Sequence, residues 1–143
     1  MTVQKILTCK GSTVHTIKPT ATIEHAAKSL SDHRIGALVV TGAEGWTIGI
    51  ISERDIVRAV SEKGSAVLDM PVSEVMTREV MTCTRGDKVV DLMQRMTEGR
   101  FRHLPVLEDG LLVGLVSIGD VVKSRIEEME QEKDALHDYI RSA

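Results

Sequence analysis

The sequence predicts a mixed α+β protein made of two copies of one module, and three observations support this. A nine-residue stretch at 49–57 recurs at 114–122, and both copies contain Gly-φ-φ-Ser-x-x-Asp, where φ is apolar. Upstream, apolar residues match at an offset of 66, as Val14 does with Val80. Each copy also has the same order of strand-like and helix-like patterns. A repeat this long is a whole folded unit, so we expect two β-α-β-β-α modules related by pseudo-two-fold symmetry.

In the first module, apolar spacing and turn residues define each element. Ile23, Ala26 and Leu30 recur at helical spacing, and Thr22 precedes them as a candidate N-cap. The glycines of 42–45 separate two strand-like runs, which predicts a hairpin. The expected elements are a helical lead-in at 2–7, a strand at 14–17, a helix through 23–30, a hairpin of 37–40 with 47–51, and a helix from 52 to about 60.

The second module repeats this order after a polar connector at 61–70. A long helix then follows, because no helix breaker occurs between Val121 and Ile140. The expected elements are a lead-in at 71–76, a strand at 80–83, a helix through 89–96, a hairpin of 104–107 with 111–116, and a helix from 117. We therefore divide the chain into a first module with its lead-in at 1–68, a second module at 69–124 and a C-terminal helix at 125–143.

Composition narrows the classes of protein. A net charge of −3 argues against nucleic-acid binding by bulk electrostatics, and aromatic residues at 2% leave few platforms for stacked bases. The N-terminal residues open no signal peptide, and no apolar run approaches the ~18 residues of a transmembrane helix. We therefore expect a soluble, cytoplasmic protein that binds neither nucleic acid nor membrane. The two cysteines, Cys9 and Cys83, are expected to be buried free thiols.

The two Ser-x-x-Asp motifs have two compatible interpretations. Each follows a strand and precedes an apolar helical run, so the Ser and the Asp can form a capping box at the start of a helix. The free N–H groups at such a helix start also favour an anion. An Asp one turn later can accept hydrogen bonds from a ribose diol. The motifs alone leave both structural capping and nucleotide binding open.

The duplicated modules and the two motifs resemble a tandem pair of CBS domains, and Arg-His-Leu-Pro-Val at 102–106 adds to the resemblance. The likeness covers nearly the whole chain and is strongest to small stand-alone bacterial CBS-pair proteins, which carry no catalytic domain. In that family the paired modules form a Bateman module, whose cleft binds adenine nucleotides such as AMP, ADP, ATP or NAD. The resemblance implies a non-catalytic sensor that transmits its ligand state to a partner protein.

The resemblance also implies two sets of nucleotide-binding residues. The first set is Thr16, Ile17, Ala37, Ser52, Arg54 and Asp55. The second set is Thr82, Cys83, Arg102, His103, Pro105, Ser117 and Asp120. The sets differ because Arg54 of the first motif is replaced by Gly119 in the second. The sites could therefore differ in affinity, Arg54 could serve a phosphate from across the cleft, or only one site could be fully competent. Arg34, Arg58 and Arg100 lie nearby in sequence, as solvated surface or as ligand contacts.

Other chemistry has little support in the sequence. The five histidines form no i, i+4 pair and no Cys-x-x-Cys accompanies them, so we expect no metal site. No catalytic cofactor motif, nucleophile elbow or adjacent general base is present, so we expect no catalytic residue and no enzyme. Met76, Met81, Met93 and Met96 fall at periodic positions and are expected in the core. A structural protein whose motifs only cap helices remains the alternative function.

The apolar faces predict a homodimer. The first helix of each module and the C-terminal helix present more apolar surface than small sheets can cover. The C-terminal stripe is Val122, Ile126, Met129, Leu136 and Ile140. We expect this helix to pack on its own body or on a second subunit.

Overall fold

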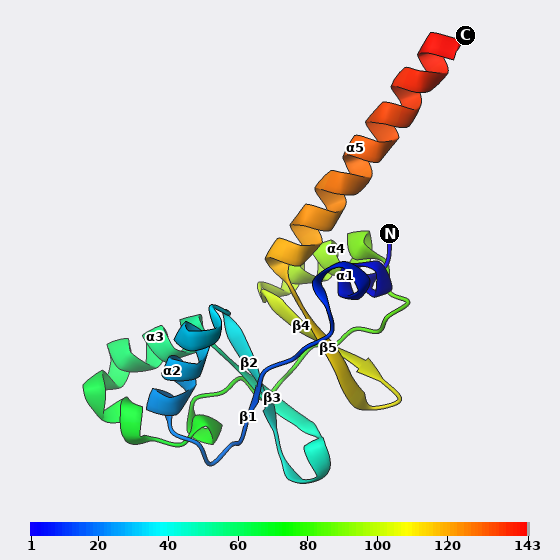
Figure 1. The fold of residues 1–143 in the computed structure, drawn as a ribbon. Coiled ribbons are helices and arrows are strands. Elements are labelled where there is room, and N and C mark those ends of the chain that lie inside the picture. Colours follow the sequence, from blue (N-terminus) through cyan, green and yellow to red (C-terminus); the bar gives the residue numbers. More distant parts are fainter. Residues whose placement is uncertain (143) are drawn as a thin grey trace.

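The computed structural model describes residues 1–142 and consists of two halves, each with a β-hairpin covered by helices (Figure 1). Thr22 caps a helix as predicted, its side chain accepting a hydrogen bond from the His25 amide. Helix α1 (Val3–Lys10) comes first in the chain. The elements of the first half are then β1 (Thr16–Ile17), α2 (Ile23–His33), β2 (Ala37–Thr41), η1 (Ala43–Gly45), β3 (Thr47–Ser52) and α3 (Glu53–Lys63).

The second half repeats the order with some elements reduced. The predicted polar connector contains a 3₁₀ helix, and its Val67 is fully buried. The predicted lead-in is a short 3₁₀ helix with Pro71 as N-cap rather than as its first residue. The connector forms η2 (Gly64–Asp69), and the lead-in forms η3 (Val72–Glu74). The elements of the second half are then α4 (Val89–Gly99), β4 (His103–Glu108), β5 (Leu111–Ser117) and α5 (Ile118–Ser142).

The two sheets differ in size. In the first half β1 pairs parallel to β2, and β2 pairs antiparallel to β3. The second half has the hairpin β4–β5, and the predicted strand at 80–83 is wrong, because only Cys83 makes an isolated parallel bridge to Val106. Val80 does not extend the bridge into a strand, since its backbone N–H donates to the nearby Arg78 carbonyl at 3.0 Å. The predicted strand at 14–17 is likewise shortened to two residues.

Each half has its own aliphatic core, but the lead-in segments cross between them. Helix α1 precedes the first half in the chain, yet its Val3, Ile6 and Leu7 belong to the core of the second half. Conversely, Val72 and Met76, which follow the first half, belong to its core. Neither half would keep a complete core without the other, which explains why two small modules form one body.

Helix α5 packs on the body only at its start. Val121 and Ser124 are buried, whereas the apolar side chains further along are more than half exposed. The helix projects away from both halves (Figure 1), so its outer part does not pack on its own body. The exposed apolar residues of this part are Ile126, Met129, Leu136, Tyr139 and Ile140. Among the described helices, none combines the length and the apolarity that crossing a bilayer requires.

The cysteines are both free, in different surroundings. Cys83 is buried in the core of the second half, as predicted, but Cys9 is exposed on α1, so the prediction of burial is wrong for Cys9. Helix α1 turns its Ile6 and Leu7 to the core, and the helical period places Cys9 on the outer face. Burial raises the pKa of the Cys83 thiol to about 12, with a further increase from Asp87 and an opposing effect from Arg95.

Candidate functional site

A cleft of about 350 Å³ lies between the two halves and contains the first Ser-x-x-Asp motif. One wall comes from the end of β3 and the start of α3. The other wall comes from the segment before Cys83 and from the start of β4. The lining residues are Gly36, Ile50, Ser52, Glu53, Arg54, Asp55, Arg58, Thr77, Glu79, Val80, Met81, Gly99, Arg100, Phe101, Arg102 and His103.

Ser52 and Asp55 form the complete capping box that the spacing predicts. The Ser52 hydroxyl accepts the Asp55 backbone N–H at 3.2 Å, and the Asp55 carboxylate accepts the Ser52 backbone N–H at 3.0 Å. The Ser52 hydroxyl also donates to the same carboxylate oxygen at 3.0 Å. Among the described residues, the other oxygen accepts one long hydrogen bond, 3.3 Å, from the Thr77 hydroxyl. The capping box therefore fixes the carboxylate while leaving one oxygen weakly held at the cleft wall.

The opposite wall carries His103, which is half-buried at the first residue of β4. Burial lowers the pKa of His103, and Lys10 and Arg102 lower it further against the opposing attraction of Asp120 and Glu53. The imidazole is therefore neutral near pH 7, and it can both donate and accept a hydrogen bond. A neutral ring suits contact with an uncharged part of a ligand.

The cleft is rich in arginine. Its lining includes Arg54, Arg58, Arg100 and Arg102. A second hollow of about 330 Å³ shares three of these arginines, and its own lining contains no acidic residue. It is lined by Arg54, Met96, Thr97, Arg100, Phe101, Arg102 and Ile118. The cleft also contains Glu53, Asp55 and Glu79, so the basic surface suited to an anionic group lies at the three arginines that the two hollows share.

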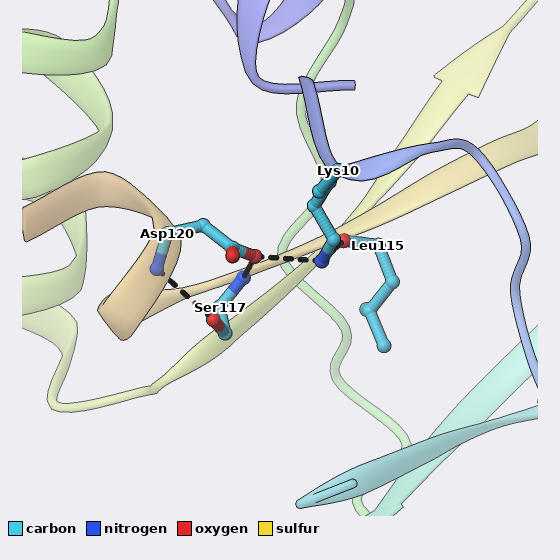
Figure 2. Close-up of polar contacts among 4 residues, drawn as sticks. All are labelled: Lys10, Leu115, Ser117 and Asp120. Carbon is cyan, nitrogen blue, oxygen red and sulfur yellow. Dashed lines mark hydrogen bonds and ion pairs between the residues drawn. The ribbon is translucent and has the colours of Figure 1, made fainter. Parts of the chain in front are cut away.

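The second motif has the same caps but a different partner for its carboxylate (Figure 2). Asp120 accepts the Ser117 backbone N–H at 2.9 Å, and the Ser117 hydroxyl accepts the Asp120 N–H at 3.2 Å. The Lys10 ammonium donates to the same Asp120 oxygen at 2.7 Å. Partial burial alone would raise the pKa of Asp120, but the hydrogen bonds from Lys10 and Ser117 outweigh it and lower the pKa.

Five predicted site residues meet at the cleft, three from the first half and two from the second. These are Ser52, Arg54, Asp55, Arg102 and His103. The sequence placed Arg102 and His103 in the second set, whereas in the structure they line the cleft that contains the first motif. Two of the arginines noted nearby, Arg58 and Arg100, also line the cleft. Arg34 does not line it and adopts left-handed backbone geometry at the end of α2.

The other predicted residues lie outside the lining of this cleft. Ile17 and Cys83 are buried in the two cores, where they pack with aliphatic side chains. Ala37 is buried opposite Ser52 in the β2–β3 ladder, and Pro105 pairs with Leu115. The remaining predicted residues outside the lining are Thr16, on β1, Thr82, next to Cys83, and the second-motif residues Ser117 and Asp120.

The sequence did not point to several residues of the cleft. Met81 was expected in the core but is 53% exposed and lines the cleft, because the segment before Cys83 does not form a strand. Thr77 was also missed, although it pairs its backbone with Ile50 and donates to Asp55. Phe101 borders both hollows. Met81 could have been suspected, because it directly precedes the predicted Thr82 in the sequence.

Comparisons with known proteins agree with this architecture. The sequence model of the CBS domain matches twice, at residues 11–62 and 72–127. The chain is 40% identical over 124 residues to the mitochondrial CBS domain-containing protein CBSX3 of Arabidopsis thaliana, covering 84% of this chain and 60% of that protein. The chain thus spans less than two thirds of that relative.

Two solved structures share the fold. The CBS-domain containing protein ATU1752 of Agrobacterium tumefaciens superimposes with a TM-score of 0.84 and 48% identity, covering 87% of this chain and 92% of that one. The CBS domain protein PAE2072 of Pyrobaculum aerophilum, solved in complex with AMP, gives a TM-score of 0.75 and 29% identity, covering 84% and 89%. With two matched domains that together span most of its length, the chain belongs to the CBS-domain family as one tandem pair.

Proposed function

We propose that the protein is a non-catalytic sensor that binds an adenine nucleotide, AMP, ADP, ATP or NAD, in the cleft between its two halves. One observation carries the proposal: a fixed carboxylate from one half lines the same cleft as two arginines and a neutral histidine from the other half. Asp55 supplies the carboxylate, and Arg102 and His103 belong to the opposite half. The AMP complex of PAE2072, whose fold is similar, supports the same class of ligand.

Asp55 is the proposed ribose anchor. Its capping box aims the carboxylate without using all of its acceptor capacity, because one oxygen holds only the 3.3 Å contact from Thr77. A carboxylate can accept two hydrogen bonds from the vicinal hydroxyls of a ribose. The diol would replace or share the weak Thr77 contact without breaking the cap between Ser52 and Asp55.

The arginines of the cleft are the proposed phosphate ligands. Arg54 lies two residues after Ser52, and Arg100 and Arg102 approach from the other half. The adjoining hollow extends the basic surface past these three side chains, with no acidic residue in its lining. This leaves room for a second or third phosphate, and charge-assisted hydrogen bonds from guanidinium groups suit such anions.

Regulation through a homodimer completes the proposal. A ligand that contacts both halves would change the stability of one arrangement of the halves relative to others. Helix α5 is continuous with the second motif. The apolar stripe of α5 is exposed in the single chain, and a two-fold dimer would bury the same stripe on both subunits. A regulated partner protein would then respond to the nucleotide through the dimer surface.

A thermal-unfolding screen tests the ligand class. AMP, ADP, ATP, NAD, adenosine, S-adenosylmethionine and GMP are added singly, and unfolding is followed by scanning fluorimetry. A ligand at 100 times its Kd stabilises the fold by about 2.7 kcal/mol. We expect a clear increase in Tm with at least one adenine nucleotide and a smaller one with adenosine. No shift with any adenine nucleotide, or a shift with S-adenosylmethionine alone, would contradict the proposal.

A structural protein is the second candidate, because both capping boxes are present in full. In that case the Ser-x-x-Asp motifs would only stabilise helix starts. The two candidates differ for Asp55→Asn, since the single asparagine oxygen can keep the cap, but the amide NH2 then takes the place of the free carboxylate oxygen and can only donate to a ribose. Loss of nucleotide stabilisation with a nearly unchanged Tm of the free protein favours the sensor.

A further inference from the structure

The aspartates of the two motifs are held by different donors. In the first half, the Ile50 carbonyl accepts the Thr77 backbone N–H at 2.9 Å, and Asp55 accepts the Thr77 hydroxyl at 3.3 Å. In the second half, the corresponding acceptors are the Leu115 carbonyl and Asp120. Both receive hydrogen bonds from the Lys10 ammonium, at 2.9 and 2.7 Å (Figure 2). An uncharged threonine in one half is thus replaced by a cation in the other.

We infer that Lys10 determines which motif takes the nucleotide, by occupying the carboxylate of Asp120, so that each chain binds one nucleotide at Asp55. The inference rests on the proposed function and specifies it further. The Ser, the Asp and the backbone caps are the same in both motifs, so these groups by themselves do not distinguish the two aspartates.

The longer first lead-in explains how Lys10 reaches Asp120. Val3 and Val72 are both fully buried at the start of a lead-in. Eleven positions separate Val3 from Val14, but eight separate Val72 from Val80. The extra residues let α1 continue to Lys10, whereas η3 ends after Glu74. Because α1 packs on the core of the second half, the lysine at its last position lies beside the second motif.

The surroundings of the two aspartates agree with this difference. Asp55 lines the cleft of about 350 Å³ between the halves. Asp120 lines a hollow of about 120 Å³ beside α1 and α5, together with Lys10. The side chains of Lys10 and Asp120 are 38% and 24% exposed, so the pair is partly shielded from water.

An ammonium competes with a ribose diol better than a threonine hydroxyl does. The Lys10 ammonium and a ribose diol would compete for the carboxylate of Asp120. The contact from Lys10 is short and charge-assisted, and the chain keeps the lysine next to Asp120. A diol at Asp120 would have to displace this contact. Hydrogen bonds to charged groups contribute enough to weaken such binding by roughly ten- to hundredfold.

Equilibrium dialysis with radiolabelled AMP tests the inference by counting nucleotides bound per chain at saturation. The wild type is compared with Lys10→Met, which keeps the length of the side chain but removes the cation. Lys5→Met is the matched control, since Lys5 lies on the same helix and lines the same small hollow. The double variant Lys10→Met/Asp120→Asn shows whether any additional nucleotide binds at Asp120.

We expect one AMP per chain for the wild type and for Lys5→Met, two for Lys10→Met, and one again for the double variant. If the wild type binds one and Lys10→Met also binds one, Lys10 does not exclude a ligand, while the proposed function stands. Two per chain in the wild type would likewise overturn the role of Lys10 and leave the proposed function standing. If the wild type binds none and Lys10→Met binds one, the inference about Lys10 holds and the proposed site at Asp55 fails. Binding by neither protein overturns both.

Discussion

The imidazole of His103 lies against Gly36, so closely that a Cβ at Gly36 would come within 3.2 Å of the imidazole Nε2. The two residues belong to opposite halves, and both line the cleft. They also stand at adjacent repeat positions, Gly36 before β2 and His103 at the first residue of β4. The width of the cleft at this point therefore depends on the absence of a side chain at Gly36.

Gly36→Ala should weaken nucleotide binding more than it affects folding. The methyl group would press on the His103 ring and displace it towards the ligand space. Gly86→Ala is the control, because a Cβ there meets nothing within 4 Å. We expect AMP affinity to fall several-fold in the first variant only, measured by fluorescence titration. Equal affinities would mean that His103 does not border the ligand.

Arg54→Ala should distinguish nucleotides from nucleosides. If Arg54 binds phosphate, its removal costs about 1.5–3 kcal/mol for AMP or ATP and little for adenosine. Arg34→Ala is the control, since Arg34 does not line the cleft. Competition binding with the three ligands provides the comparison. An equal loss for adenosine and AMP would place Arg54 away from the phosphate.

His103 should make stability depend on pH. Its pKa is lower in the folded protein than in the unfolded chain, so between the two values the unfolded chain binds more protons. The contribution of His103 to folding stability is fully present above its unfolded-chain pKa of about 6.5. This contribution is lost as the pH falls through the pKa of His103 in the folded protein. Urea unfolding at several pH values should show a loss of stability on acidification that is smaller in His103→Gln. His137→Gln, on the outer part of α5, should behave as wild type; identical slopes in all three proteins would refute the prediction.

The two thiols should differ in reactivity. Cys9 is exposed, whereas Cys83 is buried with its pKa raised to about 12, so the Cys83 thiolate is scarce at pH 8. A disulfide reagent should modify one thiol per chain in the native protein and the second only after unfolding. Cys9→Ser should remove the fast phase. Rapid reaction of both thiols in the native state would mean that the second core opens readily.

The stripe on α5 should stabilise the proposed dimer. Met129 is 54% exposed in the single chain, and burying this exposed half of the side chain contributes about 1–1.5 kcal/mol on each subunit. Met129→Lys should therefore weaken the dimer, and Gln131→Lys makes the same charge change at a neighbouring position off the stripe. Light scattering should give about twice the 15.7 kDa chain mass for wild type and Gln131→Lys, and less for Met129→Lys at micromolar concentration. A wild-type monomer would contradict the proposed dimer.

The sequence predicted the repeated architecture well, because hydrophobic periodicity and the two motifs report on local structure. The spacing of Ser52 with Asp55 and of Ser117 with Asp120 predicted both capping boxes. The helix α5 was recognisable from the lack of any breaker. These features depend on residues close together in the chain, so no knowledge of the tertiary structure was needed.

The composition of the cleft was less accessible. Grouping residues by repeat assigned His103 to the second motif, but the packing of the two halves brings it to the first. The exchange of lead-ins between the cores could not be read from chain order, and so the contact of Lys10 with Asp120 went unnoticed. Such contacts depend on how the halves pack, and periodicity carries no information about that.

Calorimetric titration of AMP into wild type, Asp55→Asn and Asp120→Asn tests the central claim most directly. Both substitutions keep the size of the side chain and an oxygen for the cap, whose loss would cost about 1 kcal/mol. Asp120→Asn also removes the charge that pairs with Lys10, a partly exposed contact worth about 1 kcal/mol or less. We predict that Asp55→Asn loses at least about tenfold in affinity while Asp120→Asn binds AMP as the wild type does. Wild-type affinity in Asp55→Asn, or an equal loss in both variants, would contradict a nucleotide site anchored by Asp55.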